Sequence, residues 1–439
     1  LSNNSNSYTG DTTVSEGTLT LTGNLSSSTD LIISPGATLD LQATQTVTSL
    51  DLDGTISNSA GSSALTVSGT SAIGGNITTD GNQIYTGAIT LTGNSILTSS
   101  SGAITLSSTV NGGSSLTTSS SSNFIASGVI GAGTPLSSLS VTAGGNAQYF
   151  GNITTTGAIT FNAVGNVDAG GTITLRTTNS NVTLNADSDG DGTGTFYGGT
   201  ITINSGSGNV IIRGSTIANE SYSVVGTGTL TIESNAASFG STFTSSYLSE
   251  AATLTGLTIG KSTNTSTVTM NSAISIAGPV TIYGNDINLN QAITGSGNIT
   301  ITAAQDIWMN TGFTQIYSTG SGNFIKLLAK RNISNLTNAP SIILTTTGGD
   351  ILVASDTDNS GGGVITIITG SRFESNGGDI TIAGGSTTGS GYAKGYSDTT
   401  WFGEGLRLDG TVNIASSNGN IILRGQAYNG SISPGQGAA

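Results

Sequence analysis

Asp187, Asp189 and Asp191 stand at alternate positions in the stretch NADSDGDGTGTF. Alternate carboxylates followed by a glycine, here Gly192, are typical of loops that place hard oxygen ligands around one calcium ion. The helices that usually flank such loops are not indicated, and the twelfth position, which usually holds a glutamate, is Gly198. The spacing therefore predicts either a calcium site or a solvated, aspartate-rich turn. Mutual repulsion of three carboxylates favours a bound ion.

A second, weaker copy of this pattern occurs later in the chain. Asp356 and Asp358 precede Ser360 in DILVASDTDNSGGGV, so the third carboxylate is missing. Each stretch is followed by a similar segment, VIIRGST after the first and ITIAGGST after the second. We therefore expect two related loops on repeated structural units, with Ca²⁺ as the cofactor of the first and a weaker candidate at the second.

Aromatic side chains gather in one glycine-rich stretch, GSGYAKGYSDTTWFGEG, at 389–405. Tyr392, Tyr396, Trp401 and Phe402 lie there in a chain whose aromatic content is only 5%. Exposed aromatic rings can stack on sugars or hold a partner molecule. The alternative is that they fold over the side of the protein and cover part of its core. We treat these four residues as candidate contacts for a ligand or partner.

The charge balance excludes several classes of function. The chain carries a net charge of −14, and no Lys or Arg precedes Arg176. Nucleic acid and anionic membranes are therefore unsuitable partners, whereas multivalent cations are suitable. The one basic cluster, Lys326, Lys330 and Arg331, predicts either a solvated patch or a contact with acidic surface on a neighbouring subunit. Cys and His are absent, which excludes disulfides, thiol nucleophiles and the usual zinc sites.

The elements that must position these residues are short strands. Triplets of the form apolar, small polar, apolar recur throughout, for example at 89–91, 173–175 and 299–301. Two-residue alternation bounded by Gly, Asn and Ser predicts strands, and no helical period competes with it. Disorder is the first alternative for 439 residues with 66 glycines and 8% charged residues, but the regular apolar spacing argues against it. No apolar run is long enough to span a membrane.

Strands about 8 to 12 residues apart could form a sandwich of hairpins or a solenoid. Asn-Gly and Asp-Gly hairpin turns are not placed between paired strands, and the units resemble one another, which favours the solenoid. We expect coils of roughly 20 residues with two or three strands each and short loop insertions. Aliphatic residues should stack inward, and Gly and Asn should form the corners because both tolerate positive φ. The outward positions should carry threonines, namely Thr90, Thr105, Thr174, Thr202, Thr300 and Thr381.

The first residues, NNSNSYTGDTTVSEGTLTLTG, resemble the autotransporter-associated β-strand repeat. The segment QIYTGAITLTGNSILTSSSGAITLSSTVNGGSSLTT is similar to repeats of filamentous-haemagglutinin-like exoproteins. This resemblance implies an all-β, right-handed parallel β-helix that is exported through an outer-membrane transporter and used in adhesion. It also implies a secreted or bacterial cell-surface location. The family's N-terminal secretion domain and C-terminal barrel are missing, so we expect a segment of a larger exoprotein.

We expect one continuous solenoid over 1–439. It would comprise autotransporter-like coils at 1–45, haemagglutinin-like repeats without basic residues at 46–175, and repeats with Asp loops at 176–439. The predicted function is structural or adhesive, without enzymatic activity. The expected partners are further copies, added head to tail, or glycans of host or neighbouring cells.

The alternative is a polysaccharide lyase, a glycosidase or a carbohydrate-binding passenger on the same fold. Such an enzyme needs converging carboxylates together with bases, which the sequence does not indicate. Ice binding through ranks of threonine is a third possibility, but the threonine pairs are irregular.

Overall fold

The structure is a computed structural model of the whole chain. It describes all residues except Ser5, Tyr247, Ala251 and the ranges 311–314, 336–340, 397–401 and 429–439. The described residues form no helix, and hence none that is long and apolar enough to cross a bilayer. They divide into two compact units, Leu1–Gly228 (unit 1) and Thr229–Ala439 (unit 2).

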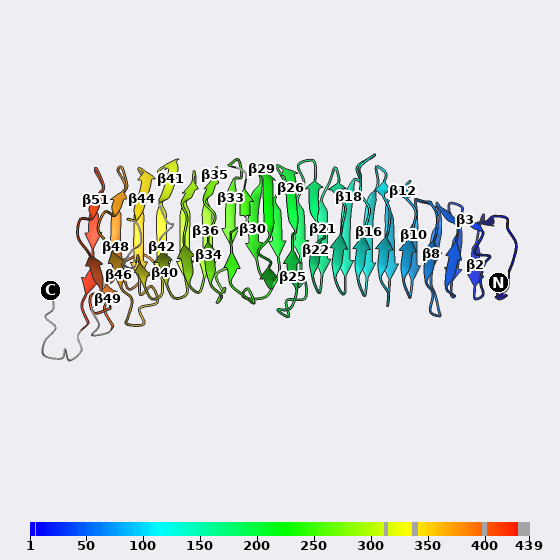
Figure 1. The fold of residues 1–439 in the computed structure, drawn as a ribbon, viewed down its shortest axis with the longest axis horizontal. Coiled ribbons are helices and arrows are strands. Elements are labelled where there is room, and N and C mark those ends of the chain that lie inside the picture. The colour runs from blue at the N-terminus through cyan, green and yellow to red at the C-terminus, as the bar shows by residue number, and fades with distance from the viewer. Residues whose placement is uncertain are drawn as a thin grey trace. The chain divides into compact units, whose positions relative to one another are not determined.

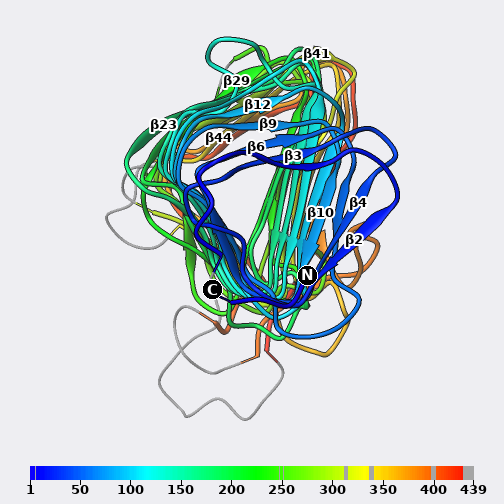
Figure 2. The same cartoon turned by 90° about the vertical axis from the view of Figure 1, so that its right-hand side faces the viewer.

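Unit 1 is a parallel β-helix, in which most coils contribute one strand to each of three sheets. Strands of one sheet come from successive coils, so β3 (Asp30–Ile33), β6 (Ser49–Leu52), β9 (Ser71–Ile73) and β12 (Ile89–Leu91) lie behind one another in Figure 2. Figure 1 shows β3 and β12 at successive places along the unit.

The first sheet of unit 1 contains β2 (Thr18–Leu21), β4 (Thr38–Leu41), β7 (Thr55–Ser57), β10 (Asn76–Thr79), β13 (Ser95–Ser99), β16 (Ser115–Ser120), β18 (Ser138–Ala143), β21 (Ile159–Ala163), β24 (Val182–Asn185) and β27 (Val210–Arg213). The second contains β5 (Gln45–Val47), β8 (Leu65–Val67), β11 (Gln83–Tyr85), β14 (Ile104–Leu106), β17 (Phe124–Ala126), β19 (Ala147–Tyr149), β22 (Val167–Ala169), β25 (Thr195–Tyr197) and β28 (Thr216–Ile217). The third contains β1 (Thr12–Val14), β3 (Asp30–Ile33), β6 (Ser49–Leu52), β9 (Ser71–Ile73), β12 (Ile89–Leu91), β15 (Val110–Asn111), β20 (Ile153–Thr154), β23 (Thr172–Arg176), β26 (Thr200–Gly206) and β29 (Ser221–Gly226), with Ile130 bridging β15 and β20.

Unit 2 repeats this plan, and most of its strands also belong to three parallel sheets. Its first sheet contains β30 (Thr229–Glu233), β33 (Gly256–Ile259), β36 (Val280–Gly284), β39 (Ile299–Ala303), β42 (Ile325–Ala329), β45 (Ile351–Ser355), β48 (Ile380–Gly384) and β52 (Ile421–Leu423). The second contains β31 (Phe243–Thr244), β34 (Val268–Met270), β37 (Ile287–Leu289), β40 (Ile307–Met309), β43 (Ile333–Ser334), β46 (Ile365–Ile367) and β50 (Leu406–Leu408). The third contains β35 (Ile274–Ile276), β38 (Ile293–Gly295), β41 (Ile316–Ser321), β44 (Ile343–Thr347), β47 (Arg372–Glu374) and β51 (Asn413–Ala415). The remaining strands are β32 (Leu248–Glu250) and the pair β49 (Ala393–Lys394) and β53 (Gly425–Gln426).

The coils differ in length, but paired strands stay in register except at two shifts, one between Asn204 and Gly206 and one between Ser318 and Ser321. Side chains that meet between adjacent coils are 17 residues apart at Gln42 and Ser59, and 20 apart at Gln148 and Asp168. In unit 2 the separation reaches 41 residues, between Ser375 and the backbone of Ser416. The predicted fold class and coil length are therefore confirmed, and the extra residues lie in the connections between strands.

The core of each unit consists of columns of inward-facing apolar side chains. In unit 2 one column runs through eight neighbouring strands of one sheet and contains Leu230, Leu257, Val280, Ile299, Ile325, Ile351, Ile380 and Ile421. The first seven of these side chains are buried, whereas Ile421 is 46% exposed. The six predicted outward threonines are exposed or half-buried, as expected. Stacking at parallel-sheet spacing removes the aliphatic side chains from water and leaves threonine hydroxyls at the surface.

Some corner asparagines have positive φ, as we expected, for example Asn376 at 53°, but others stabilise the corners in a second way. Asn123, Asn146 and Asn166 have ordinary negative φ, so their tolerance of positive φ is not what these corners use. Instead, the Oδ1 of each accepts a backbone N–H from the next coil, and the donors are Asn146 (2.8 Å), Asn166 (2.9 Å) and Thr195 (2.8 Å). The amide side chain thus satisfies a backbone donor that a turn leaves without a strand partner.

Unit 2 has the same kind of ladder. Asp286 Oδ1 accepts the N–H of Asp306 (3.2 Å), Asp306 Oδ1 accepts that of Asn332 (2.9 Å), and Asn332 Oδ1 accepts that of Val364 (3.1 Å). Each ladder ends at the residue that follows one of the two aspartate loops, Thr195 in unit 1 and Val364 in unit 2. The corner ladders therefore hold both loops at equivalent places in their coils.

Candidate functional site

The first aspartate loop connects β24 to β25 in unit 1. It begins with Asp187 in the left-handed region, at φ 57°. The carbonyl of Asp187 accepts the N–H of Gly190 (3.0 Å), and its Oδ1 accepts the N–H of Gly192 (3.0 Å). These bonds curl six residues around the first aspartate, which is the curl that the spacing and glycines predict.

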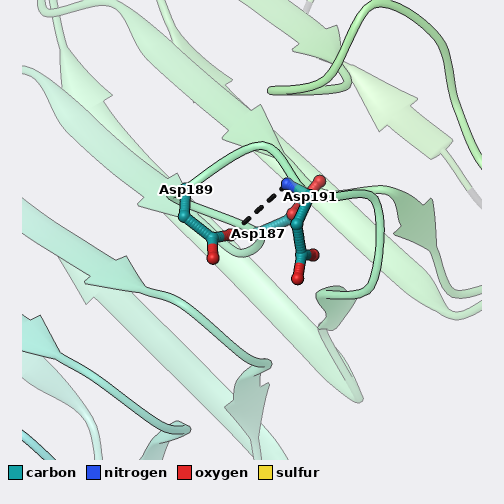
Figure 3. Close-up of side chains that lie close together, drawn as sticks. All are labelled: Asp187, Asp189 and Asp191. Carbon is teal, nitrogen blue, oxygen red and sulfur yellow. Dashed lines mark hydrogen bonds between the residues drawn. The ribbon is translucent and has the colours of Figure 1, made fainter.

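The three aspartates of this loop converge, as Figure 3 shows. One carboxylate oxygen from each of Asp187, Asp189 and Asp191 lies within 4.8 Å of those of the other two. Asp189 and Asp191 are exposed, whereas Asp187 is fully buried, with 0% of its surface accessible. The Oδ2 atom of Asp187 has no hydrogen-bond partner, so one buried carboxylate oxygen remains available to a ligand.

Electrostatics makes an ionised Asp187 unfavourable in the folded chain. Burial raises the pKa of this carboxyl, and the charges of Asp191 and Asp189 act in the same direction, while hydrogen bonds from Gly192 and Thr193 oppose them. Because the pKa of Asp187 is higher in the folded chain than in the unfolded chain, protonation of this carboxyl at low pH stabilises the fold. That stabilisation is lost as pH rises through the folded-state pKa of Asp187. A bound cation would remove this cost at neutral pH. Asp191 differs, because a hydrogen bond from the Thr193 hydroxyl lowers its pKa.

The second loop, between β45 and β46 in unit 2, has the same backbone conformation. Asp356 has φ 48°, its carbonyl accepts the N–H of Asn359 (2.8 Å), and its Oδ1 accepts the N–H of Gly361 (3.1 Å). Asp356 is also fully buried, and Asp358 is exposed. The structure therefore confirms that the two sequence repeats form related loops.

The two loops differ in the group that faces the buried aspartate. The ammonium Nζ of Lys394, on β49, lies 3.5 Å from Asp356 Oδ2 and donates a hydrogen bond to Asn359 Oδ1 (2.8 Å). Asp356 Oδ2 accepts no hydrogen bond, so its contact with Lys394 is an ion pair. Lys394 was not among the predicted site residues, because it stands 35 residues after Asn359. The only signal was one lysine within the aromatic stretch.

The aromatic stretch divides into packed and exposed residues. The rings of Tyr396 and Phe402 stack with centroids 5.4 Å apart, and both side chains are half-buried. The hydroxyl of Tyr396 accepts a hydrogen bond from Asn332 Nδ2 (3.1 Å), which ties the insertion to a coil 64 residues earlier. Tyr392 lies apart and is 52% exposed, which leaves it available to a ligand. Trp401 lies outside the described residues.

Replacing Asn332 with alanine should lower the free energy of unfolding by about 1–3 kcal/mol. The buried N–H of Val364 would lose its acceptor, and Tyr396 would lose its donor. Tyr396→Phe is the matched control, because it removes only the second hydrogen bond and should cost less. Equilibrium unfolding in urea measures both variants. An equal loss in the two variants would contradict a role for Asn332 at the corner.

Two residues of the basic cluster, Arg331 and Lys326, have partners within their own unit, while Lys330 is exposed. Arg331 forms a two-pronged ion pair with the buried Asp306, including a hydrogen bond of 2.8 Å from Nε to Oδ1. Lys326 Nζ lies 4.3 Å from the centre of the Phe324 ring. The side chain of Arg331 is 47% exposed, which agrees with a solvated patch, and its ion pair also stabilises a corner next to the ladder residue Asn332.

Comparisons with known proteins find no relative of this chain. No family model matches it, and neither a curated protein nor a solved structure does. The resemblance to haemagglutinin-like and autotransporter-associated repeats therefore stays a prediction. The geometry of the described residues is therefore the basis for inferring a function.

Proposed function

We propose that this chain is a structural or adhesive segment of a secreted or bacterial cell-surface protein. Its stacked coils serve as a stiff spacer, and the loops between strands make the contacts with other molecules. The observation that carries this proposal is that the parallel strand pairing continues, with only two register shifts, while the separation between adjacent coils varies from 17 to 41 residues. A scaffold that absorbs insertions in this way can vary its surface without changing its core.

The two exposed features of the loops indicate where contacts would form. One is the aspartate loop of unit 1, and the other is the insertion that carries Tyr392. An exposed tyrosine ring offers an apolar face and a hydroxyl, which suits a sugar or the surface of another protein. We therefore propose surface glycans or further copies of the chain as partners.

An enzymatic role, as a polysaccharide lyase or glycosidase, has less support. Catalysis of this kind requires carboxylates beside a group that stabilises developing charge. The carboxylates that converge in unit 1 are Asp187, Asp189 and Asp191, whereas the described ion pairs of Lys and Arg all lie in unit 2. The structural role is therefore the better supported of the two.

The experiment compares binding with turnover in the same preparation. Beads coated with the chain should adhere to cells or to immobilised glycans, or the chain should self-associate in analytical ultracentrifugation as its concentration rises. Tyr392→Ala should weaken glycan binding, with Tyr197→Ala, another exposed tyrosine but in unit 1, as the matched control. Steady cleavage of an acidic polysaccharide, abolished by Asp189→Asn, would overturn the proposal, as would the absence of both adhesion and self-association.

A further inference from the structure

The Lys394 ammonium completes the second aspartate loop. Asp356 is fully buried and would otherwise carry an uncompensated negative charge away from water, which is costly. Lys394 reaches it from β49, whose backbone pairs with Gly363 in both directions, N–H to carbonyl at 2.9 Å each way. The second loop therefore contains a cation supplied by the chain itself.

The first loop has the same shape and a larger negative charge, but the backbone hydrogen bond that Lys394 makes to the second loop is made here by a neutral residue, Ser215. Gly194 closes the first loop as Gly363 closes the second, and the backbone N–H of Ser215 donates to the carbonyl of Gly194 (2.8 Å). The Ser215 hydroxyl donates to the carbonyl of Gly192 (2.6 Å) rather than to a carboxylate. Asp191 adds a carboxylate at the position that Ser360 takes in the second loop.

We propose that Asp187, Asp189 and Asp191 bind one divalent hard cation, which has the role that Lys394 has beside Asp356. Two independent observations point to the cation. The Oδ2 atom of the buried Asp187 has no partner, and the equivalent oxygen of Asp356 faces an ammonium group. The inference does not depend on the proposed adhesive role, because it concerns charge compensation in the loop itself.

The spacing of the oxygens suits calcium. Calcium–oxygen distances of 2.3–2.6 Å place two ligands of one ion at most about 5 Å apart. The three carboxylate oxygens lie within 4.8 Å of one another and so can share one ion. Two of the three ligands are exposed, which leaves room for waters to complete a shell of about 6–8 oxygens. Magnesium requires stricter octahedral geometry, so we expect it to bind more weakly than calcium.

Isothermal titration calorimetry of the full chain, after treatment with a chelator, tests this site. We expect saturable binding of one Ca²⁺ per chain, with a dissociation constant on the order of 10⁻⁴–10⁻³ M, as in extracellular modules. D191S should abolish this binding, because it leaves the first loop with two carboxylates and a serine, as in the second loop. D51S removes another exposed carboxylate of unit 1 and should leave binding unchanged. Circular dichroism checks that each variant is folded.

A gain-of-binding variant tests the comparison of the two loops. S360D/K394M adds the third carboxylate to the second loop and removes its ammonium while keeping the apolar stem. We expect this variant to bind two Ca²⁺ ions per chain, and S360D/K394M/D191S to bind one. No saturable binding to the unmodified chain, or equal binding by D191S and the unmodified chain, would overturn the metal site. A single Ca²⁺ bound by folded S360D/K394M would overturn the equivalence with Lys394.

Discussion

Phe161→Ala should lower the free energy of unfolding of unit 1 by about 3–5 kcal/mol. Phe161 lies on β21 and is fully buried between Tyr149, with ring centroids 4.9 Å apart, and Phe124, at 6.2 Å. Alanine would leave a cavity where three aromatic rings now meet in the interior of the coils. The loss of stability should exceed the free energy of burying the ring, because coils held in register by parallel pairing cannot move inward to fill the cavity.

Thr160→Ala is the matched control for this variant. Thr160 is the neighbouring residue on β21 and points outward, so its loss should change stability by less than about 0.5 kcal/mol. Far-UV circular dichroism follows both units during unfolding, whereas the two tryptophans, Trp308 and Trp401, belong to unit 2. A destabilised unit 1 should therefore shift the circular dichroism transition more than the tryptophan fluorescence transition. Equal shifts for Phe161→Ala and Thr160→Ala would contradict the prediction.

Gly194→Ala should destabilise unit 1 by about 3 kcal/mol and also abolish calcium binding. A Cβ atom at this position would lie 2.2 Å from the backbone N of Asp187 and 2.5 Å from the carbonyl oxygen of Gly165. Both neighbours are backbone atoms of the corner, so neither can move aside as a flexible side chain can. The first turn of the loop would have to shift, and with it the buried carboxylate of Asp187.

The control is Gly113→Ala, because a Cβ atom there meets nothing within 4 Å and its φ is not positive. This substitution should change stability little and leave calcium binding intact. Thermal unfolding with calcium and with chelator measures both effects for each variant. If Gly194→Ala kept the calcium-dependent rise in the unfolding temperature, the glycine would not be needed for the loop, and the proposed geometry of the site would be wrong.

Much of this architecture can be predicted from local residue patterns. The alternation of Ile, Val or Leu with Thr in triplets such as 299–301 predicts strands with one buried face, and the structure confirms both. The Asp-x-Asp-x-Asp-Gly spacing predicts the curl around Asp187, because the bonds that form it join residues two to five positions apart. The relation between the loops at Asp187 and Asp356 was also predictable, since each repeats the same local sequence and therefore the same turn.

The roles of the corner asparagines were not predictable from the same patterns. An asparagine in a glycine-rich turn is compatible with positive φ and with a side-chain hydrogen bond. Only the stacking of coils brings a backbone N–H of the next coil to the side-chain oxygen that accepts it. Asn166 accepts the N–H of Thr195, 29 residues further on, because an insertion lies between them. The sequence does not show which residues become neighbours when coil lengths vary. The pairing of two strands depends on the number of residues in the connections between them, and that number differs from coil to coil.

The sequence by itself determined the strands, the direction of their apolar faces and the two aspartate turns, because these depend on contacts between residues close together in the chain. Only the tertiary structure decided that most coils have three strands, that Asn332 joins a corner to Tyr396, and that Lys394 faces Asp356 while Ser215 makes the corresponding backbone hydrogen bond to the first loop. Those contacts join different coils. They form because parallel stacking brings together residues that are 17 to 64 positions apart, with insertions setting each separation.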